Sequence, residues 1–432
     1  MGLSACSRQL AKGISMRTNR RTLLAGGLGL MATPVLAADW PQFRGPGRTG
    51  ISTETGLLKE WPQGGPRLVW QRQDLGDGYS SVAASGGKLY AISNKGMDNE
   101  MVHALDAATG RTLWSTKIGV VGAPMQQPAY PGSRSTPTVS GGMVYALGSD
   151  GDLVCLEAAG GKVVWQHHVR KEFGGAHGVW AYSESPLVDG DRVICTPGGE
   201  TTLLAVDKRT GAVAWRSQAP GGDQAGYSSV VAATVAGVRQ YVQFVQKGVI
   251  GVEAAGGKFL WRYDRTAMNS PANIPTPVVD GDLVYTASGR GGCALIRIRA
   301  NGGALAAEEV YFNPRLPSAI GGSVKVGENL YGTSGTGLMC VNFADGAIRW
   351  QDRCVGAGAI AVADGRIYVF GENGEAALVE AAGDGYREKG RFRPSNPPER
   401  GQSKSWAYPV VANGRLYLRE LGCLWCYDIK AA

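Results

Sequence analysis

Short apolar runs along this chain alternate with glycine-centred turns in one recurring pattern. A small residue in an apolar run is followed six positions later by glycine and ten positions later by tryptophan. A polar residue two places after the small one opens the turn, so each copy predicts a strand, a tight turn and a second strand ending in an aromatic residue. A hairpin that recurs about every 45 to 50 residues indicates a β-propeller or a similar array. The copies are Ala104/Gly110/Trp114, Cys155/Gly161/Trp165, Ala205/Gly211/Trp215, Gly251/Gly257/Trp261 and Cys340/Gly346/Trp350.

Each hairpin is preceded by two further predicted strands, which gives the four strands of one propeller blade. Two copies are degenerate: one keeps Gly302 and Gly303 at the turn but has no tryptophan, and another ends in Phe392. The last copy stops after its third strand, at Asp428, and the missing strand is supplied by "PRLVWQ" with Trp70. The pattern therefore predicts an all-β chain, an eight-bladed propeller of four-stranded antiparallel blades. Pairing of the N-terminal strand with the C-terminal blade closes the ring and removes exposed sheet edges.

The first residues predict an export signal. A basic start, a modest apolar core and a small-residue exit are typical of a secretory leader, and Arg20-Arg21 indicates the twin-arginine class. The alternative is a general secretory signal in which the two arginines occur by chance. No cysteine stands at the exit, so we expect no lipid anchor and a periplasmic, soluble location. The expected domains are a twin-arginine signal peptide at 1–38, an N-terminal extension at 39–67 and the propeller at 68–432.

Composition supports the fold and excludes some partners. The 65 glycines, 21 prolines and 19% charged residues suit an all-β chain with many turns. The leader holds five basic residues and no acidic one, so the formal charge of +8 falls to +3 without it. That charge gives no electrostatic case for nucleic acid. No apolar stretch beyond the leader is long enough to span a membrane, and we expect a monomer.

The hairpins "LDAATGRTLW", "VDKRTGAVAW" and "VNFADGAIRW" resemble the pyrroloquinoline-quinone-type (PQQ-like) propeller repeat, and "DWPQFRGPGRTG" resembles the N-terminal segment of many secreted members. The resemblance covers residues 39 to 428 and implies the eight-bladed fold. The family contains quinoprotein alcohol dehydrogenases and an outer-membrane assembly lipoprotein that has no cofactor. The resemblance also implies that the terminal tryptophans dock on the neighbouring blade. They are Trp70, Trp114, Trp165, Trp215, Trp261 and Trp350.

Departures from the family leave the function open. The quinoprotein dehydrogenases share a pair of adjacent cysteines over the cofactor and are longer, whereas no two cysteines are adjacent here. The first hypothesis is therefore a ligand- or protein-binding scaffold in the cell envelope, with an envelope protein or a small anionic or planar ligand as partner. The alternatives are a PQQ-dependent dehydrogenase with quinone and calcium at the channel mouth, and a propeller that binds carbohydrate or peptide.

The cysteines and histidines offer little chemistry. Cys155, Cys340 and Cys426 occupy the small-residue position of the hairpin, so they are interpreted as small core residues. Cys423 and Cys426 lie three apart on a predicted strand, which directs them to opposite faces and predicts that they form no disulfide with each other. The four histidines stand at no metal-binding spacing, and no catalytic motif is found.

A ligand site is predicted at the channel mouth, which blade-joining loops surround. Two of these loops carry the tripeptide Trp-Ala-Tyr, and "GYSS" also occurs twice at blade entries. Aromatic and basic side chains there could stack and hold a planar or anionic group. The alternative interpretation is that the aromatic residues only pack over the channel. The candidate residues are Arg134, His177, Trp180, Tyr182, Glu184, Arg290, Lys404 and Trp406.

Overall fold

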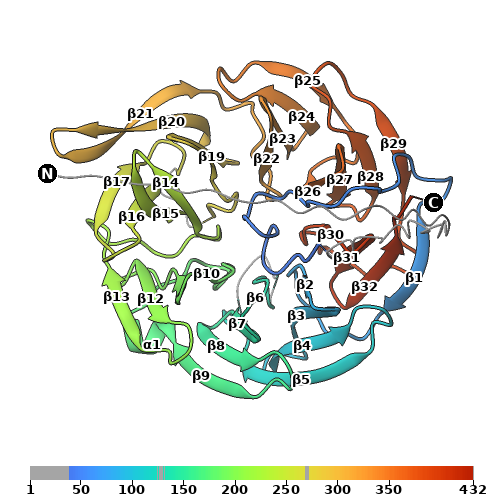
Figure 1. Cartoon of the computed structure of the whole chain (residues 1–432), viewed down its shortest axis with the longest axis horizontal. Coiled ribbons are helices and arrows are strands. Elements are labelled where there is room, and N and C mark those ends of the chain that lie inside the picture. Colours follow the sequence, from blue (N-terminus) through green and yellow to red (C-terminus); the bar gives the residue numbers. More distant parts are fainter. Residues whose placement is uncertain (1–37, 124, 126–129, 131, 268–271, 432) are drawn as a thin grey trace, which may run out of the picture. The chain divides into compact units, whose positions relative to one another are not determined.

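Eight four-stranded antiparallel sheets stand around a common axis (Figure 1) in the computed structural model, which describes residues 38–123, 125, 130, 132–267 and 272–431. This confirms the predicted fold. The predicted leader lies outside the described residues except for Ala38. One short helix, α1 (Val169–Phe173), follows the second blade. The described chain contains no helix long and apolar enough to cross a membrane.

Within each blade, successive strands pair as neighbours from the axis outward. The first four blades are made as follows. Blade 1 has β2 (Ala83–Ser85), β3 (Lys88–Asn94), β4 (Glu100–Asp106) and β5 (Thr112–Gly119), and blade 2 has β6 (Thr138–Ser140), β7 (Met143–Leu147), β8 (Asp152–Glu157) and β9 (Val163–His168). Blade 3 has β10 (Leu187–Asp189), β11 (Arg192–Cys195), β12 (Leu203–Asp207) and β13 (Val213–Ser217), and blade 4 has β14 (Val231–Val235), β15 (Val238–Phe244), β16 (Val249–Glu253) and β17 (Phe259–Tyr263).

The other four blades repeat the arrangement. Blade 5 has β18 (Val278–Asp280), β19 (Leu283–Ser288), β20 (Gly292–Asn301) and β21 (Ala304–Phe312), and blade 6 has β22 (Ser323–Val326), β23 (Asn329–Ser334), β24 (Gly337–Asn342) and β25 (Ile348–Asp352). Blade 7 has β26 (Gly358–Ala363), β27 (Arg366–Gly371), β28 (Ala376–Glu380) and β29 (Glu388–Phe392), and blade 8 has β30 (Val410–Ala412), β31 (Arg415–Glu420), β32 (Cys423–Asp428) and β1 (Arg67–Arg72).

The ring closes as the sequence predicts. Strand β1 pairs antiparallel with β32, and Trp70 lies directly opposite Cys426. Cys423 and Cys426 belong to two different core clusters, on opposite faces of β32, and both are free. Burial raises the pKa of the Cys423 thiol to about 11 and that of Cys426 to about 12. The prediction that they form no disulfide with each other is therefore confirmed.

The antiparallel order gives the ring two unlike ends. The turns between first and second strands, and between third and fourth strands, lie at one end, called here the hairpin end. The loops between second and third strands, and all segments joining one blade to the next, lie at the other, the mouth end. The apolar core is divided among clusters, most of which combine residues from two adjacent blades, as Tyr90 and Val144 do between blades 1 and 2.

The recurring small residue and glycine both accommodate tryptophan. Ala205 lies directly opposite Trp215 across the β12–β13 pair, where a larger side chain would meet the indole. The same indole covers Gly257 of the next blade, where an added Cβ would lie 2.6 Å from the ring. Five indole N–H groups also donate to a carbonyl in the next blade's turn. The pairs are Trp70–Ala107 (3.1 Å), Trp114–Ala158 (3.2 Å), Trp165–Lys208 (3.0 Å), Trp215–Ala254 (3.3 Å) and Trp350–Ala382 (2.8 Å).

Trp261 departs from this arrangement. Its indole N–H donates to Gln240 Oε1 (2.6 Å), within its own blade. The next blade replaces the usual short hairpin with long strands, β20 and β21, that protrude beyond the ring (Figure 1). At the following interface Tyr311 takes the tryptophan position, covering Gly346 and donating to Phe343 O (3.2 Å).

The N-terminal extension fills the centre of the ring (Figure 1). It enters from the hairpin end, where Trp40 bridges Ala84, and leaves where Ile51 bridges Val362. Between these points Arg48 is buried and its Nη1 donates to two carbonyls from different blade entries, Ser185 O (3.0 Å) and Val230 O (2.8 Å). A guanidinium suits this place because its several donors can satisfy carbonyls converging from separate blades.

Candidate functional site

A cavity of about 260 Å³ opens at the mouth end. Every residue that lines it, apart from Phe43 of the N-terminal extension, lies on a segment that joins one blade to the next. Ring geometry brings these segments together, because each precedes the innermost strand of its blade. The lining is mainly aromatic and aliphatic, with a few hydroxyl groups and one cation. We call it the aromatic cavity.

One wall of the aromatic cavity is a cluster of three rings from different loops. Trp406 lies 5.0 Å from Tyr79 and 4.9 Å from Tyr130, measured between ring centroids. Tyr79 belongs to the first "GYSS" segment. Edge-to-face and tilted contacts of this kind stabilise aromatic clusters beyond the area they bury. The three rings therefore hold each other in place while their outer surfaces face the cavity.

The opposite wall uses the second "GYSS" segment. Tyr227 lies 6.1 Å from Trp180, and its hydroxyl accepts a hydrogen bond from the Trp180 backbone N–H (2.9 Å). Phe43 forms the floor and contacts Tyr408 edge to face at 5.0 Å. The N-terminal extension thus closes the centre of the ring and also sets the depth of the aromatic cavity.

Arg134 is the cation of the aromatic cavity. Its guanidinium donates to the carbonyls of Trp180 (2.8 Å) and Gly132 (3.1 Å) and to that of Tyr130, and it lies 5.5 Å from the Tyr79 ring. Burial lowers its pKa from the ordinary arginine value. Within the described chain it forms no ion pair, because its contacts are carbonyls and a ring. The wall therefore carries a positive charge that no carboxylate neutralises.

A second hollow, of about 400 Å³, adjoins the aromatic cavity and shares Ala272, Ile274 and Ile320 with it. Arg290 and Glu372 line this polar hollow. Glu372 accepts hydrogen bonds from the Trp406 indole N–H (3.2 Å) and from Lys404 Nζ (2.7 Å). Aromatic cavity and polar hollow form one continuous depression, called here the mouth groove.

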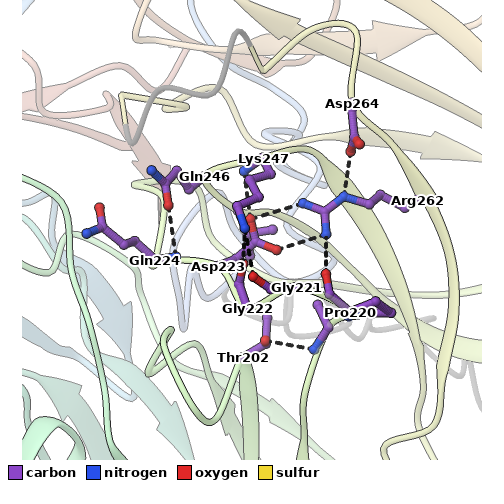
Figure 2. Close-up of polar contacts among 12 residues, drawn as sticks. Thr202, Pro220, Gly221, Gly222, Asp223, Gln224, Gln246, Lys247, Arg262 and Asp264 are labelled. Atoms are coloured by element: carbon purple, nitrogen blue, oxygen red, sulfur yellow. Dashed lines mark hydrogen bonds and ion pairs between the residues drawn. The ribbon is translucent and has the colours of Figure 1, made fainter.

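A buried group of polar contacts supports one wall of the groove, and Figure 2 shows these contacts around Asp223. The Asp223 carboxylate is fully buried, accepts the Lys247 backbone N–H (2.8 Å) and pairs with Arg262 at 2.9 Å. Lys247 Nζ donates to the carbonyls of Gly221 and Gly222, each at 2.7 Å. Blade 4 thereby fixes the segment that leads from blade 3 to Tyr227, so this wall is preorganised.

The structure places five of the eight candidate residues at or beside the groove and three behind its wall. Arg134, Trp180 and Trp406 line the aromatic cavity, and Arg290 lines the polar hollow. Lys404 lies beside the groove, paired with Glu372.

The remaining three candidates pack behind the wall. Tyr182 is buried and its hydroxyl donates to Pro197 O (2.7 Å). His177 packs on the Tyr182 ring at 5.2 Å. Glu184 is buried, accepts the Thr196 N–H (2.7 Å), and burial raises its pKa to about 7. Sequence reasoning did not list Phe43, Tyr79, Tyr130, Tyr227 or Tyr408, although the repeated "GYSS" contained two of them.

The donor set does not fit a quinone held with calcium. Calcium takes six to eight oxygen ligands, and carboxylates are chief among them. In the described part of the chain, the residues that line the aromatic cavity include no aspartate or glutamate. No group of three or more histidine, cysteine, aspartate or glutamate residues placed to hold a metal occurs in the residues covered by the structure. The Glu100 and Glu184 carboxyls are buried and do not line the cavity: Glu100 accepts the Ser149 N–H and the Ser133 hydroxyl, and one oxygen of Glu184 accepts the Thr196 N–H.

Comparison with known proteins places the chain among PQQ-type propellers. The family model described as outer membrane protein assembly factor BamB matches residues 98–352. The chain is 24% identical over 175 residues to BamB of Moranella endobia, covering 39% of this chain and 41% of that protein. It is 25% identical over 301 residues to BamB of Yersinia pestis, covering 65% and 69%. The chain thus spans under half of the first relative's length.

A quinone-type relative matches over a shorter segment, and two solved structures match at lower sequence identity. The dehydrogenase subunit of a quinone alcohol dehydrogenase from Komagataeibacter europaeus is 31% identical over 138 residues, 30% of this chain and 18% of that protein. BamB from Moraxella catarrhalis superposes with a TM-score of 0.61 at 16% identity, covering 84% and 98% of the two chains. A quinohemoprotein alcohol dehydrogenase from Pseudomonas putida gives 0.63 at 14%, covering 91% and 81%. At these identities the structural matches show the fold alone.

Proposed function

Because the chain belongs to the PQQ-type propeller family described as outer membrane protein assembly factor BamB, we propose that it is an envelope scaffold that binds another envelope protein at its mouth groove. The predicted leader supports a periplasmic location. The proposed role is in the assembly of outer-membrane proteins, which is the role that the names of its BamB relatives state for them.

One observation carries this proposal. The mouth groove is lined by aromatic side chains from several blade-joining segments, and buried polar contacts hold one of its walls in position. Aromatic residues that hold each other in position bind a partner at low entropic cost, and such residues dominate protein interfaces. An exposed apolar side chain adjoins one of the lining residues: Val179, next to Trp180 in the chain, is 53% exposed.

Site-specific photo-crosslinking in the native envelope tests the proposal. A crosslinker replaces Val179 at the mouth end or Leu113, which is 42% exposed on β5, as the matched control near the hairpin end. We expect adducts with outer-membrane assembly proteins from position 179 only, and their loss in the Trp406→Ala background. Equal adducts from both positions, or adducts unaffected by Trp406→Ala, would contradict binding at the mouth.

Depletion of the protein gives an independent measurement. We expect the levels of folded outer-membrane proteins to fall and to recover with the wild-type chain but not with a Trp180→Ala/Trp406→Ala double variant. Unchanged levels after depletion would remove the proposed role in assembly, even if the crosslinks were found.

A further inference from the structure

The mouth groove has two chemically different halves. The aromatic cavity presents Trp406, Tyr79 and Trp180, whereas the adjoining polar hollow presents Arg290 and Glu372. The shared residues Ala272, Ile274 and Ile320 join the halves without a polar barrier. A single extended ligand could therefore contact both.

The charges of the groove favour an acidic group. Glu372 is already occupied by Lys404 and by the Trp406 indole N–H. Arg290 is exposed at the hollow and forms no ion pair within the residues described here. Arg134 adds a second positive charge, which donates hydrogen bonds to carbonyls and lies beside the Tyr79 ring. Complementary charge at an interface sets register and speeds association, so the unpaired guanidinium of Arg290 selects a carboxylate.

The aromatic cavity by itself suits one large side chain. It holds about 260 Å³, near the lower limit of the roughly 300 to 1,000 Å³ typical of pockets for drug-sized ligands. One large aromatic side chain would bury most of its surface there, and such an anchor typically supplies much of the binding energy of an interface.

We infer that the mouth groove binds an extended peptide segment whose aromatic side chain enters the aromatic cavity while a nearby acidic side chain pairs with Arg290. The inference rests on the proposed function, since it names the chemistry of the partner that the scaffold holds. Because the recognition elements are side-chain pockets, the segment needs no defined structure before binding and orders on the groove.

Fluorescence anisotropy with the purified chain tests this inference. The probes are fluorescein-labelled glycine–serine peptides that carry one tryptophan and one aspartate at increasing separations. Peptides with only the tryptophan or only the aspartate are the references. We expect one separation to bind about two- to fivefold more tightly than the tryptophan-only peptide, because Arg290 is exposed and an ion pair at an exposed position contributes little.

Matched variants separate the two halves. Arg290→Gln should abolish the advantage of the aspartate and leave the tryptophan-only peptide unchanged, and Trp406→Ala should weaken both peptides. Arg209→Gln removes the same charge from a side chain 78% exposed at the hairpin end, and it should change neither. Thermal denaturation checks that each variant is folded.

Three results would overturn the inference. One is a tryptophan–aspartate peptide that binds no better than the tryptophan-only peptide at any separation. Another is an Arg290→Gln variant that weakens both peptides equally. The third is that free indole-3-acetate displaces the tryptophan–aspartate peptide completely and binds with the same affinity as that peptide. The ligand of the groove would then be a small aromatic acid. If no peptide binds while the position-179 crosslinks persist, the inference fails and the proposed scaffold function stands. If the crosslinks are absent too, both fail.

Discussion

The two ends of the ring are built by different rules. At the hairpin end one arrangement recurs: an indole lies opposite a small residue and covers a glycine of the next blade, as Trp114 covers Gly161. At the mouth end the described connections differ in length and share only short motifs, and they carry buried charges and aromatic clusters instead. The repeated residues stabilise the interfaces between blades. The irregular connections can therefore differ in sequence, and can bind a partner, without disturbing those interfaces.

The interface between blades 4 and 5 shows what happens where repetition stops. Trp261 turns to Gln240 of its own blade, and the long β20–β21 hairpin packs Ile298 and Leu305 against the blade 4 side of the cluster. Apolar side chains thus replace the indole–glycine contact there. The ring tolerates such an exception because each interface has its own core cluster.

The largest expected effect comes from removing an indole at the hairpin end. Trp215→Ala should lower the free energy of unfolding by about 3 to 5 kcal/mol, since it empties a buried site between blades 3 and 4. Trp406→Ala at the mouth should cost about 1 kcal/mol, because its partners Tyr79 and Tyr130 lie in a partly open wall. Chemical denaturation measures both. Equal losses of unfolding free energy in the two variants would contradict the proposed difference between the two ends.

A pH series tests the buried charge behind the mouth wall. Burial raises the Glu184 pKa from 4.5 to about 7, so the folded state binds the proton more tightly than the unfolded state. This group therefore stabilises the fold most below about pH 4.5, and its contribution is lost as pH rises to about 7. The full shift corresponds to about 3 kcal/mol.

Glu184→Gln should remove this pH dependence. The stability of the variant relative to wild type should rise between pH 4.5 and 8, measured by urea denaturation at each pH. Glu328→Gln, whose side chain is 86% exposed at the hairpin end, is the control and should show no such trend. Parallel curves for wild type and Glu184→Gln would mean that the Glu184 carboxyl titrates normally.

A matched pair of glycines in blade 4 tests how much the contact between indole and glycine at the hairpin end contributes to stability. Gly257 and Gly237 have nearly equal φ angles, +77° and +76°, so alanine is strained at both. An added Cβ lies 2.6 Å from the Trp215 ring at Gly257 but meets nothing within 4 Å at Gly237. Gly257→Ala should therefore lose about 1 to 3 kcal/mol more than Gly237→Ala, the usual cost of overpacking. Equal thermal shifts would show that only backbone strain selects glycine.

The smallest expected effect concerns a charge pair at the mouth. Lys404 contacts Glu372 at 2.7 Å, but its side chain is 50% exposed. Lys404→Gln should change stability by less than about 1 kcal/mol, because exposed ion pairs are screened by water and salt. The position-179 crosslinks should also persist, since Glu372 keeps the Trp406 indole. A loss of crosslinks as large as that of Trp406→Ala would place Lys404 in the binding surface.

Parts of the mouth could be predicted from the sequence. Trp180 and Trp406 stood out because the same tripeptide recurs on two blade-joining loops, and both line the aromatic cavity. The same reasoning grouped Tyr182 and Glu184 with them, although both side chains turn into the interface behind the wall. An irregular loop has no fixed period, so the sequence does not show which of its side chains face the cavity and which face the interface behind it. Phe43 lies 36 residues before Tyr79 in the sequence, and nothing local indicates that the two line the same cavity.

The sequence by itself determined the blade, the number of blades and the closure of the ring, because these follow from contacts repeated at fixed spacing: a small residue opposite an indole, a glycine beneath it and an alternation of buried positions. Only the tertiary structure decided the site. The cavity exists because seven blade-joining segments converge on one axis and because the N-terminal extension, held by Arg48, brings Phe43 to its floor. Such contacts join single residues far apart in the chain, and each occurs once, so no period in the sequence records them.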